Sequence, residues 1–265
     1  MNNNQHSFEG KNIVTGYDKK IIIDGVDITI PSNKISVIIG SNGCGKSTLL
    51  KTLARLIKPI SGDIVIDGKK VTSMPSKQLA KVLGLLPQSP VVPEGITVWD
   101  LVSRGRFPYQ TMLKSMSKED FEAVEEALEI MGITDLANRC VDELSGGQRQ
   151  RVWIAMALAQ QTDILLLDEP TTYLDLAHQL EVLEVLDELN KKYNTTIVMV
   201  IHELNNAARF ADHMIGVKKG KICCKGTAEE VMTKENLREL FNIDSEIVTD
   251  PRTKKPVCIT YDMVR

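Results

Sequence analysis

Residues 40–48 constrain the fold of this chain more than any other segment. Their sequence, Gly-Ser-Asn-Gly-Cys-Gly-Lys-Ser-Thr, fits the pattern G-x-x-x-x-G-K-[ST] of a phosphate-binding loop. The apolar run at 35–39 before it predicts a buried strand, and we expect a helix to begin near Lys46 and to continue through Leu56. Background residue usage gives a chance match of roughly 1% for a chain of this length. The segment, called the phosphate loop below, therefore predicts nucleotide binding.

The residue types in the phosphate loop suit the phosphates of ATP. Its glycines let the backbone turn tightly and direct N–H groups inward, and the helix N-terminus that follows carries partial positive charge. Lys46 adds a full charge for the β- and γ-phosphates, and the Ser47 hydroxyl is placed to ligate Mg²⁺. The expected nucleotide-binding residues here are Gly40, Ser41, Asn42, Gly43, Cys44, Gly45, Lys46, Ser47 and Thr48.

Composition places the chain among ordinary globular proteins. It has 265 residues, 43% of them hydrophobic and 25% charged, and its formal net charge is -3. Without a basic excess, nothing favours a nucleic-acid partner. Residues 1–12 are polar and lack the apolar core of a secretory signal, and no apolar run approaches the ~18 residues that span a bilayer. We therefore expect a cytosolic or peripheral protein.

The five cysteines show no C-x-x-C pair, which favours reduced thiols and no zinc site. Cys223 and Cys224 are adjacent, so on a regular strand they are expected to face opposite sides. Cys44 lies at a helix N-terminus, where the pKa of a thiol can fall. One interpretation is a reactive thiol whose alkylation blocks ATP binding, and the other is a small side chain that fills a tight loop.

A second glycine pair precedes a predicted helix at 148–159. The sequence there is Leu-Ser-Gly-Gly-Gln at 144–148, and the Ser145 hydroxyl with the N–H groups of Gly146 and Gly147 could bind an anion. A plain helix start is the competing interpretation. Two anion-binding helix starts far apart in one chain suggest a nucleotide that is held from two sides.

Two carboxylates end an unbroken apolar run at 164–167. Such a run is typical of a central strand in a parallel sheet, and parallel sheets place ligands at the carboxyl ends of their strands. We expect Asp168 to reach Mg²⁺ through its water shell and Glu169 to lie near an attacking water. His202 ends a further predicted strand at 195–201, on the same sheet edge, and Asp175 is expected to cap a helix.

Periodicity and turn residues divide the rest of the chain into short elements. The other expected strands are 13–17, 21–30, a strand and turn within 64–69, 82–87, 214–218, 221–225, 245–249 and 256–261. The other expected helices are 76–81, 98–104, a helix that follows a capping box at 117–120 and is closed by Gly132, and 228–241. We expect one domain over 1–265, with a core and β subdomain at about 8–88 and 160–265 and a helical subdomain at about 89–159.

Together these motifs resemble the ATP-binding subunit of ABC transporters over nearly the whole chain. Tyr17, by itself an ordinary strand aromatic, matches the residue that stacks on adenine, and Gln88 matches the glutamine that touches Mg²⁺ and senses the membrane subunit. Residues 40–48, 144–148, 164–169, 173–175 and His202 match the family's Walker A, LSGGQ, Walker B, D-loop and switch-histidine motifs, with Tyr173 a mild departure. The resemblance implies an α/β fold: a P-loop ABC ATPase with a RecA-like parallel-sheet core, an N-terminal antiparallel β subdomain and an inserted α-helical subdomain.

Residues 97–109 and 170–175 narrow the resemblance to importers of iron-siderophores, haem and cobalamin, although zinc and manganese importer subunits share parts of both segments. The resemblance implies a homodimer in which each ATP lies between Gly45, Lys46 and Ser47 of one copy and Ser145 and Gly147 of the other, with Asp175 nearby and Glu169 and His202 as catalytic groups. It also implies integral-membrane permease subunits, an indirect link to an extracellular or periplasmic substrate-binding protein, and a peripheral location at the cytoplasmic face of the membrane.

Two alternatives to an importer motor for iron-siderophores stay open. One is an importer subunit for haem, cobalamin or a divalent metal, or a soluble ABC ATPase without a transporter. The interval from Gln88 to Leu144 is too short for the coiled-coil insertion of DNA-repair members, whereas the iron-sulfur assembly type is disfavoured only by residues 97–109. The other is a nucleotide-binding scaffold that does not hydrolyse ATP, which the presence of Glu169 and His202 disfavours.

Overall fold

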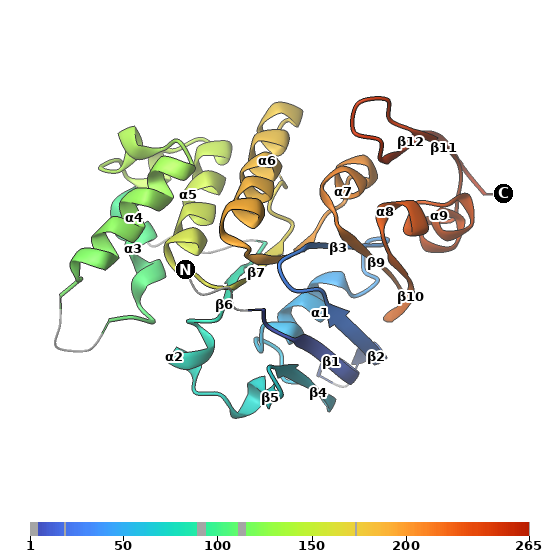
Figure 1. The fold of residues 1–265 in the computed structure, drawn as a ribbon, viewed down its shortest axis with the longest axis horizontal. Helices are drawn as coiled ribbons and strands as arrows, with labels where there is room; N and C mark the ends of the chain where they lie inside the picture. Colours follow the sequence, from blue (N-terminus) through green and yellow to red (C-terminus); the bar gives the residue numbers. More distant parts are fainter. Residues whose placement is uncertain (1–4, 19, 89–93, 111–114, 173, 265) are drawn as a thin grey trace. The chain divides into compact units, whose positions relative to one another are not determined.

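The computed structural model describes residues 5–18, 20–88, 94–110, 115–172 and 174–264 (Figure 1). The chain forms two compact units, one made of Met1–Met74 with Thr196–Arg265 and the other of Pro75–Thr195. The predicted boundaries of the helical subdomain, at about 89–159, stay a prediction. No helix within the described ranges combines the length and the apolar character needed to cross a bilayer.

An antiparallel sheet forms one part of the first unit. Its strands are β1 (Phe8–Tyr17), β2 (Lys20–Ile30), β4 (Ser61–Ile66) and β5 (Lys69–Lys70), in the order β2-β1-β4-β5. Along β2 the side chains of Val26, Ile28 and Ile30 are buried and alternate with exposed residues. This confirms the predicted alternation, in which one face of the strand packs on the core.

Parallel strands form the other sheet of the first unit. β3 (Ile35–Ile39) lies between β8 (Thr196–Val200) and β9 (His213–Lys218), parallel to both, and β10 (Lys221–Gly226) is antiparallel to β9. Every residue of β3 and β8 is buried, as expected of strands covered on both faces. The unit also contains α1 (Lys46–Leu53), the 3-10 turn at Val71–Ser73, α7 (Leu204–Phe210), α8 (Ala228–Val231), α9 (Lys234–Phe241), and the hairpin of β11 (Ile243–Thr249) and β12 (Pro256–Met263).

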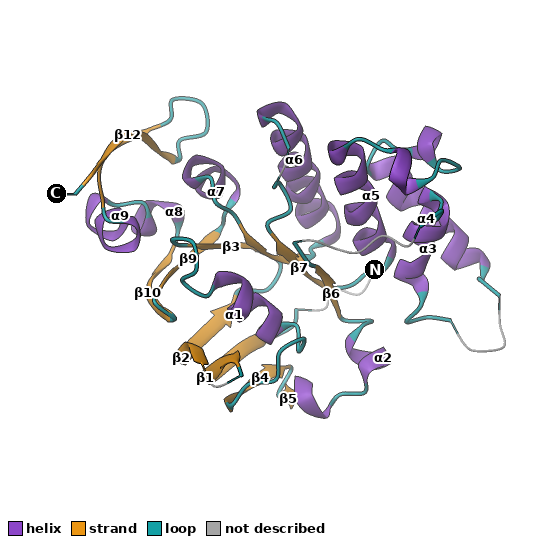
Figure 2. Ribbon diagram, turned by 180° about the vertical axis from the view of Figure 1, so that it is seen from behind, coloured by secondary structure: helices purple, strands orange, loops and turns teal. Residues whose placement is uncertain are grey.

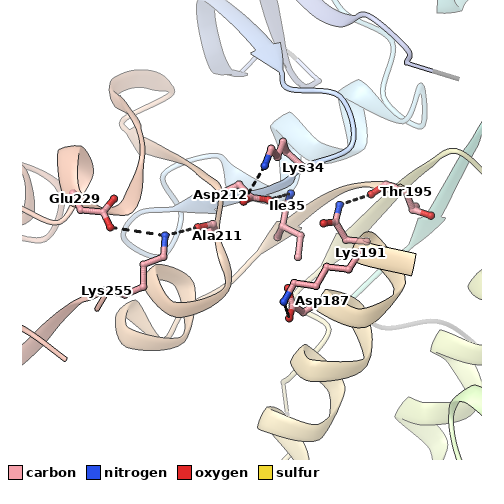
Figure 3. Close-up of polar contacts among 10 residues, drawn as sticks. Lys34, Ile35, Asp187, Lys191, Thr195, Ala211, Asp212, Glu229 and Lys255 are labelled. Atoms are coloured by element: carbon pink, nitrogen blue, oxygen red, sulfur yellow. Dashed lines mark hydrogen bonds and ion pairs between the residues drawn. The ribbon is translucent and has the colours of Figure 1, made fainter. Parts of the chain in front are cut away.

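Polar contacts hold the beginning of β3 in place (Figure 3). The Asp212 carboxylate accepts a hydrogen bond from the Ile35 N–H at 3.0 Å and pairs with Lys34 Nζ at 3.4 Å. Lys255 Nζ, from the loop before β12, contacts the carbonyl oxygen of Ala211 at 3.5 Å and the Glu229 carboxylate at 3.8 Å. Because β3 leads directly into the phosphate loop, these contacts fix the strand from which that loop emerges.

The second unit combines two parallel strands with a group of helices. β6 (Leu83–Leu86) pairs with β7 (Ile164–Asp168), and the helices are α2 (Ser76–Leu79), α3 (Val98–Ser103), α4 (Lys118–Ile130), α5 (Gly146–Ala159) and α6 (Leu176–Tyr193), with 3-10 turns at Arg104–Arg106, Thr134–Leu136 and Val141–Glu143. Helices α3, α4 and α5 pack against one another (Figure 2). The predicted capping box of α4 is confirmed, because Ser117 and Asp120 exchange hydrogen bonds.

The largest differences from the predicted helices are at α1 and at residues 228–241. Helix α1 ends at Leu53, and Leu56 is 64% exposed instead of continuing the apolar stripe. Arg55 adopts a left-handed backbone with φ of 61°, and its guanidinium donates to the carbonyl oxygens of Val71 and Met74. The predicted helix at 228–241 is two helices, because the Thr233 side chain accepts a hydrogen bond from the Asn236 N–H and so begins a new helix.

The regular strand that the expectation for Cys223 and Cys224 assumed is interrupted in the structure, although their exposure still alternates. The pairing of β10 with β9 shifts between Ile222 and Cys224, so Cys223 occupies a β-bulge. Cys223 Sγ contacts the carbonyl oxygen of Gly216 at 3.4 Å, and a side chain built at Gly216 would meet Cys224 Sγ. Both thiols therefore lie against the same residue of the neighbouring strand.

Candidate functional site

Glycine is required at two positions of the phosphate loop. Gly40 and Gly45 have φ of 148° and 111°, conformations that other residues rarely adopt. A Cβ at Gly40 would lie 2.2 Å from the carbonyl oxygen of Val217, and a Cβ at Gly45 would lie 2.7 Å from Ile23 Cδ1. The loop therefore follows its path only because these two residues have no side chain.

Neighbouring strands of the first unit support the phosphate loop from outside. The Gly220 N–H, in the turn between β9 and β10, donates to the carbonyl oxygen of Cys44 at 2.9 Å, and the Asp24 N–H of β2 donates to the carbonyl oxygen of Gly220 at 3.1 Å. These bonds connect the loop to both sheets of the unit. The loop is therefore held by the fold, which favours preorganised binding of a ligand.

A positive charge lies inside the phosphate loop. Lys46, at the first residue of α1, is only 5% exposed, and its Nζ donates to the carbonyl oxygens of Gly40 at 2.8 Å and Ser41 at 3.2 Å. Ser47 is partly buried one residue further along the first turn, whereas residues 41–43 are exposed. An ammonium group, a serine hydroxyl and the N–H groups of a helix start thus occur within one loop, and this combination suits a polyphosphate.

The Cys44 thiol is not the activated group that its place at a helix start suggests. Burial raises the pKa of this thiol, and this effect outweighs the nearby Lys46 charge and the backbone hydrogen bonds that lower it. The idea of a lowered pKa is therefore wrong. The structure supports the alternative of a small buried side chain that fills the loop.

The remaining first-unit residues predicted for the site are His202 and Tyr17. Ile38 of β3 is aligned with Val200 of β8, so the parallel strands end at one edge, where Gly40 follows β3 and His202 follows β8. The side chains of His202 and Tyr17 are exposed, and Tyr17, at the end of β1, has 49% of its surface accessible. An exposed aromatic ring can stack on a nucleotide base.

In the second unit, strands β6 and β7 bring Gln88, Asp168 and Glu169 to one edge. Leu86 is aligned with Leu167, so Gln88 and the two carboxylates leave the sheet side by side, and Gln88 Nε2 donates to Glu169 Oε2. Asp168 is 1% exposed, and Glu169 has a left-handed backbone with φ of 55°. A buried carboxylate at a strand end and a strained neighbour are typical of a functional site.

Thr172 is a member of this site that the sequence analysis missed. Its hydroxyl donates to Glu169 Oε2 at 3.0 Å, and its N–H donates to the carbonyl oxygen of Glu169 at 3.3 Å. Gln88 and Thr172 therefore both donate to the same oxygen of the Glu169 carboxylate. A threonine three residues after the glutamate could have suggested the second contact.

The second glycine pair starts a capped helix. Ser145 is the N-cap of α5, with its hydroxyl accepting from the Gln148 N–H at 3.3 Å, while Gln148 Oε1 accepts from the Ser145 N–H at 3.1 Å. The helix begins at Gly146, two residues before the predicted start. The Gln148 N–H is bonded to this cap, and the N–H groups of Gly146 and Gly147 before it are the donors that an anion could bind.

One contact relates α5 to the strand end that carries Glu169, and α6 begins shortly after it. Gln150 Nε2, in α5, donates to the carbonyl oxygen of Pro170 at 2.8 Å. Asp175 caps α6 as predicted, accepting from the His178 N–H at 2.9 Å, and hydrogen bonds from His178 lower the pKa of its carboxyl. Tyr173, the mild departure within the D-loop match, lies outside the described residues.

The candidate metal ligands in these loops are single oxygen donors. No group of three or more His, Cys, Asp or Glu side chains within the described ranges is arranged to hold a metal. The candidate ligands are the Ser47 hydroxyl, the Asp168 carboxylate and the Gln88 amide oxygen. Such hard oxygen donors suit Mg²⁺, which is commonly bound by one or two protein groups together with phosphates and water.

Comparison with known proteins identifies the family. Residues 23–172 match the family model described as "ABC transporter". The iron(3+)-hydroxamate import ATP-binding protein FhuC of Bacillus subtilis (strain 168) is 53% identical over 98% of this chain and 97% of its own length. The ferric enterobactin transport ATP-binding protein FepC of Escherichia coli (strain K12) is 45% identical over 94% of this chain and 92% of its own length.

Solved structures agree with the sequence relatives. A transporter described as of the metal-chelate ABC type, in an inward-facing conformation, matches with a TM-score of 0.82 and 29% identity over 97% of both chains. A dimeric bacterial ABC transporter cassette matches with a TM-score of 0.74 and 30% identity over 83% of this chain and 98% of its own. The fold is thus that of the P-loop ABC ATPases, with its parallel-strand core. The chain belongs to the ABC transporter family and is an ATP-hydrolysing subunit of that family.

Proposed function

We propose that this chain is the motor subunit of an importer for iron-siderophore complexes. The observation that carries the proposal is that relatives named for several chemically different siderophores match almost all of the chain. The FhuC, YusV, FpuD and FepC relatives are 45% to 53% identical over 93% to 98% of this chain. These ATP-binding proteins all match nearly the whole of this chain although they are named for different siderophores, which favours siderophores as the common class of substrate.

The proposed nucleotide chemistry assigns one task to each motif. The phosphate loop binds the phosphates of ATP with Lys46 and the backbone N–H groups, and Tyr17 stacks on the adenine. Glu169, held by Gln88 and Thr172, polarises the attacking water, and His202 contacts the γ-phosphate. Ser145, Gly146 and Gly147 bind the nucleotide of a second copy, with Asp175 close by.

Magnesium is the proposed metal, with Ser47, Gln88 and Asp168 as ligands. These residues offer hydroxyl, amide and carboxylate oxygens, and Asp168 is buried at a strand end, where a bound cation would offset the cost of its charge. When bound, Mg²⁺ neutralises charge on the phosphates. The protein residues orient it and the attacking water.

The proposed partners follow from the same function. Two copies of the chain form an ATP-dependent dimer, and permease subunits in the membrane take up the motion of its closing and opening. A substrate-binding protein outside the membrane delivers the cargo, so this chain is peripheral at the cytoplasmic face. Within the chain, we propose a helical subdomain at about 89–159 and a core and β subdomain in the remainder.

Uptake of labelled ferric siderophores by cells that lack this chain tests the proposal. We expect uptake of at least one hydroxamate or catecholate complex to fall, and to be restored by the wild-type chain but not by Glu169→Gln. Removing a group that stabilises the transition state typically costs about 10²–10³ in rate, while ATP binding is retained. Glu188→Gln, at an exposed position of α6, is the matched control and should restore uptake fully.

The outcomes separate the cargo from the motor. If siderophore uptake is unchanged across the panel while haem, cobalamin or zinc uptake falls, the cargo is wrong and the motor stands. If no transport changes although the purified chain releases phosphate from ATP, a soluble ATPase without a transporter is favoured. Full rescue by Glu169→Gln would contradict the catalytic assignment.

A further inference from the structure

Residues 104–110 lie directly against the C-terminal end of α5. At Gly105, an added Cβ would be 2.3 Å from the carbonyl oxygen of Met156 and 3.2 Å from the Ala159 side chain. Only glycine allows the two backbones to come this close. The segment after α3 and the last turn of α5 therefore form one tightly packed contact within the second unit.

Arg106 joins this contact to a second helix. Its side chain is buried, and its Nε donates to Asp120 Oδ1 at 2.8 Å while its Nη1 donates to the carbonyl oxygen of Ala159 at 2.8 Å and to Gln161 Oε1 at 3.1 Å. The guanidinium thus satisfies a carbonyl at the end of α5, where a positive charge is favourable, and pairs with a carboxylate in the first turn of α4. Burial raises the pKa of Asp120, but hydrogen bonds from Ser117 and Arg106 outweigh it and lower the pKa on balance.

Tyr109 completes the arrangement. Its ring lies 3.9 Å from the Arg106 guanidinium carbon, and its hydroxyl donates to the carbonyl oxygen of Gln160 at 3.0 Å. Gln160 Nε2 in turn donates to the carbonyl oxygen of Ala80 at 2.6 Å, after α2. We call Gly105, Arg106 and Tyr109 the α5 clamp. The clamp connects the end of α5 to α4 and to the segment after α3, and the Gln160 side chain connects it to the end of α2.

The other end of α5 carries Ser145, Gly146 and Gly147. A helix of 14 residues is about 21 Å long and transmits a displacement of one end to the other. We propose that Arg106 is a positioning residue, which fixes the C-terminal end of α5 and thereby sets where Gly146 and Gly147 meet the nucleotide of the second copy. This inference rests on the proposed function of that helix start and extends it to a residue outside the motifs.

Arg106→Lys tests the proposal, because lysine keeps the charge but cannot bond Asp120 and both acceptors at the end of α5 with one planar group. Arg104→Lys is the matched control, since Arg104 is exposed in the same segment. Hydrogen exchange of the full chain is followed at residues 150–152, near the start of α5, and at 156–161. We expect exchange in Arg106→Lys to be at least about threefold faster at both ends of α5, with ATP affinity unchanged.

The same variants are then assembled with the permease to compare transport with ATP hydrolysis. We expect Arg106→Lys to move less substrate per ATP hydrolysed, and Tyr109→Phe, which loses one hydrogen bond, to show a smaller change in the same direction. Faster exchange confined to 156–161, with transport and hydrolysis reduced in proportion, would overturn the proposal in favour of a local structural role. If the wild-type complex moves no siderophore, the proposed cargo is wrong, and hydrogen exchange still decides the role of Arg106.

Discussion

The two glycine-containing helix starts, one in each unit, look alike in sequence and differ in structure. In the phosphate loop, Gly40, Gly43 and Gly45 all have positive φ, and Gly40 and Gly45 are in close contact with neighbouring strands. At the start of α5, Gly146 and Gly147 have no positive φ, and a Cβ at Gly146 would meet nothing within 4 Å. Gly40 and Gly45 are therefore needed for the backbone path of the phosphate loop, whereas the backbone at the start of α5 does not require Gly146 and Gly147.

This difference separates two reasons for a glycine. A glycine required by backbone geometry cannot change without disturbing the fold, so its functional role cannot be tested in isolation. A glycine in open space at a helix start lets a ligand approach the N–H groups, so its replacement can test function in an intact fold. Replacing glycines one at a time in the two regions is therefore a direct test of the comparison.

The largest effect is expected for Gly40→Ala. Backbone strain at φ of 148° together with the contact to the Val217 carbonyl oxygen should lower the free energy of unfolding by roughly 3 kcal/mol and abolish ATP binding. Gly43→Ala is the matched control, because φ is 73° there but the space is open, and about 1 kcal/mol is expected. Denaturant unfolding and ATP titration measure both variants. Equal losses for the two would show that close packing at Gly40 does not matter.

A smaller effect, confined to function, is expected for Gly146→Ala. Alanine forms helices better than glycine, so stability should stay the same or rise by up to about 1 kcal/mol. In a Glu169→Gln background, which preserves the ATP-bound state, the variant should weaken ATP-dependent dimerisation about tenfold, because the methyl group obstructs the approach of a phosphate. Sedimentation with saturating Mg-ATP measures this. If the dimerisation constant is the same with and without Gly146→Ala, the start of α5 is not part of the nucleotide site. If Glu169→Gln alone stays monomeric in saturating Mg-ATP, the two-copy arrangement is wrong.

The parts of the fold that the sequence predicts correctly are those encoded by short runs of contiguous residues. The phosphate loop, the buried strands and the caps at Ser117 and Asp175 are encoded by contiguous residues, and the structure has them where the sequence indicates. Thr227 and Thr233 were readable signals for two helix starts that periodicity alone joined into one helix. By contrast, α7 begins without a side-chain cap, and no local pattern predicted it.

The features that the sequence did not predict depend on contacts between residues far apart in the chain. The end of α1 depends on hydrogen bonds from Arg55 to Val71 and Met74, and the α5 clamp depends on residues more than fifty positions apart. The contact of Gln88 with Glu169 arises only because β6 and β7 are paired in parallel register. Sequence motifs therefore name the catalytic groups, while the residues that hold those groups in place become visible only when the strands and helices are packed.

The smallest effect concerns the pH dependence of the phosphate loop and distinguishes its packed interior from an exposed helix start. Burial raises the pKa of Cys44 above 9.0, so the folded state keeps the thiol proton more firmly than the unfolded state. The contribution of Cys44 to stability should therefore be complete below pH 9.0 and should decline as the pH rises toward the folded-state pKa, by no more than about 1.4 kcal/mol per pH unit. The difference in unfolding free energy between wild type and Cys44→Ala, measured from pH 8 to 10.5, isolates this thiol from the other cysteines. If the unfolding free energy of wild type instead rises relative to that of Cys44→Ala above pH 9.0, the Lys46 charge and the helix start outweigh burial. The phosphate loop would then behave like an exposed helix N-terminus, such as the start of α5, and the comparison would fail.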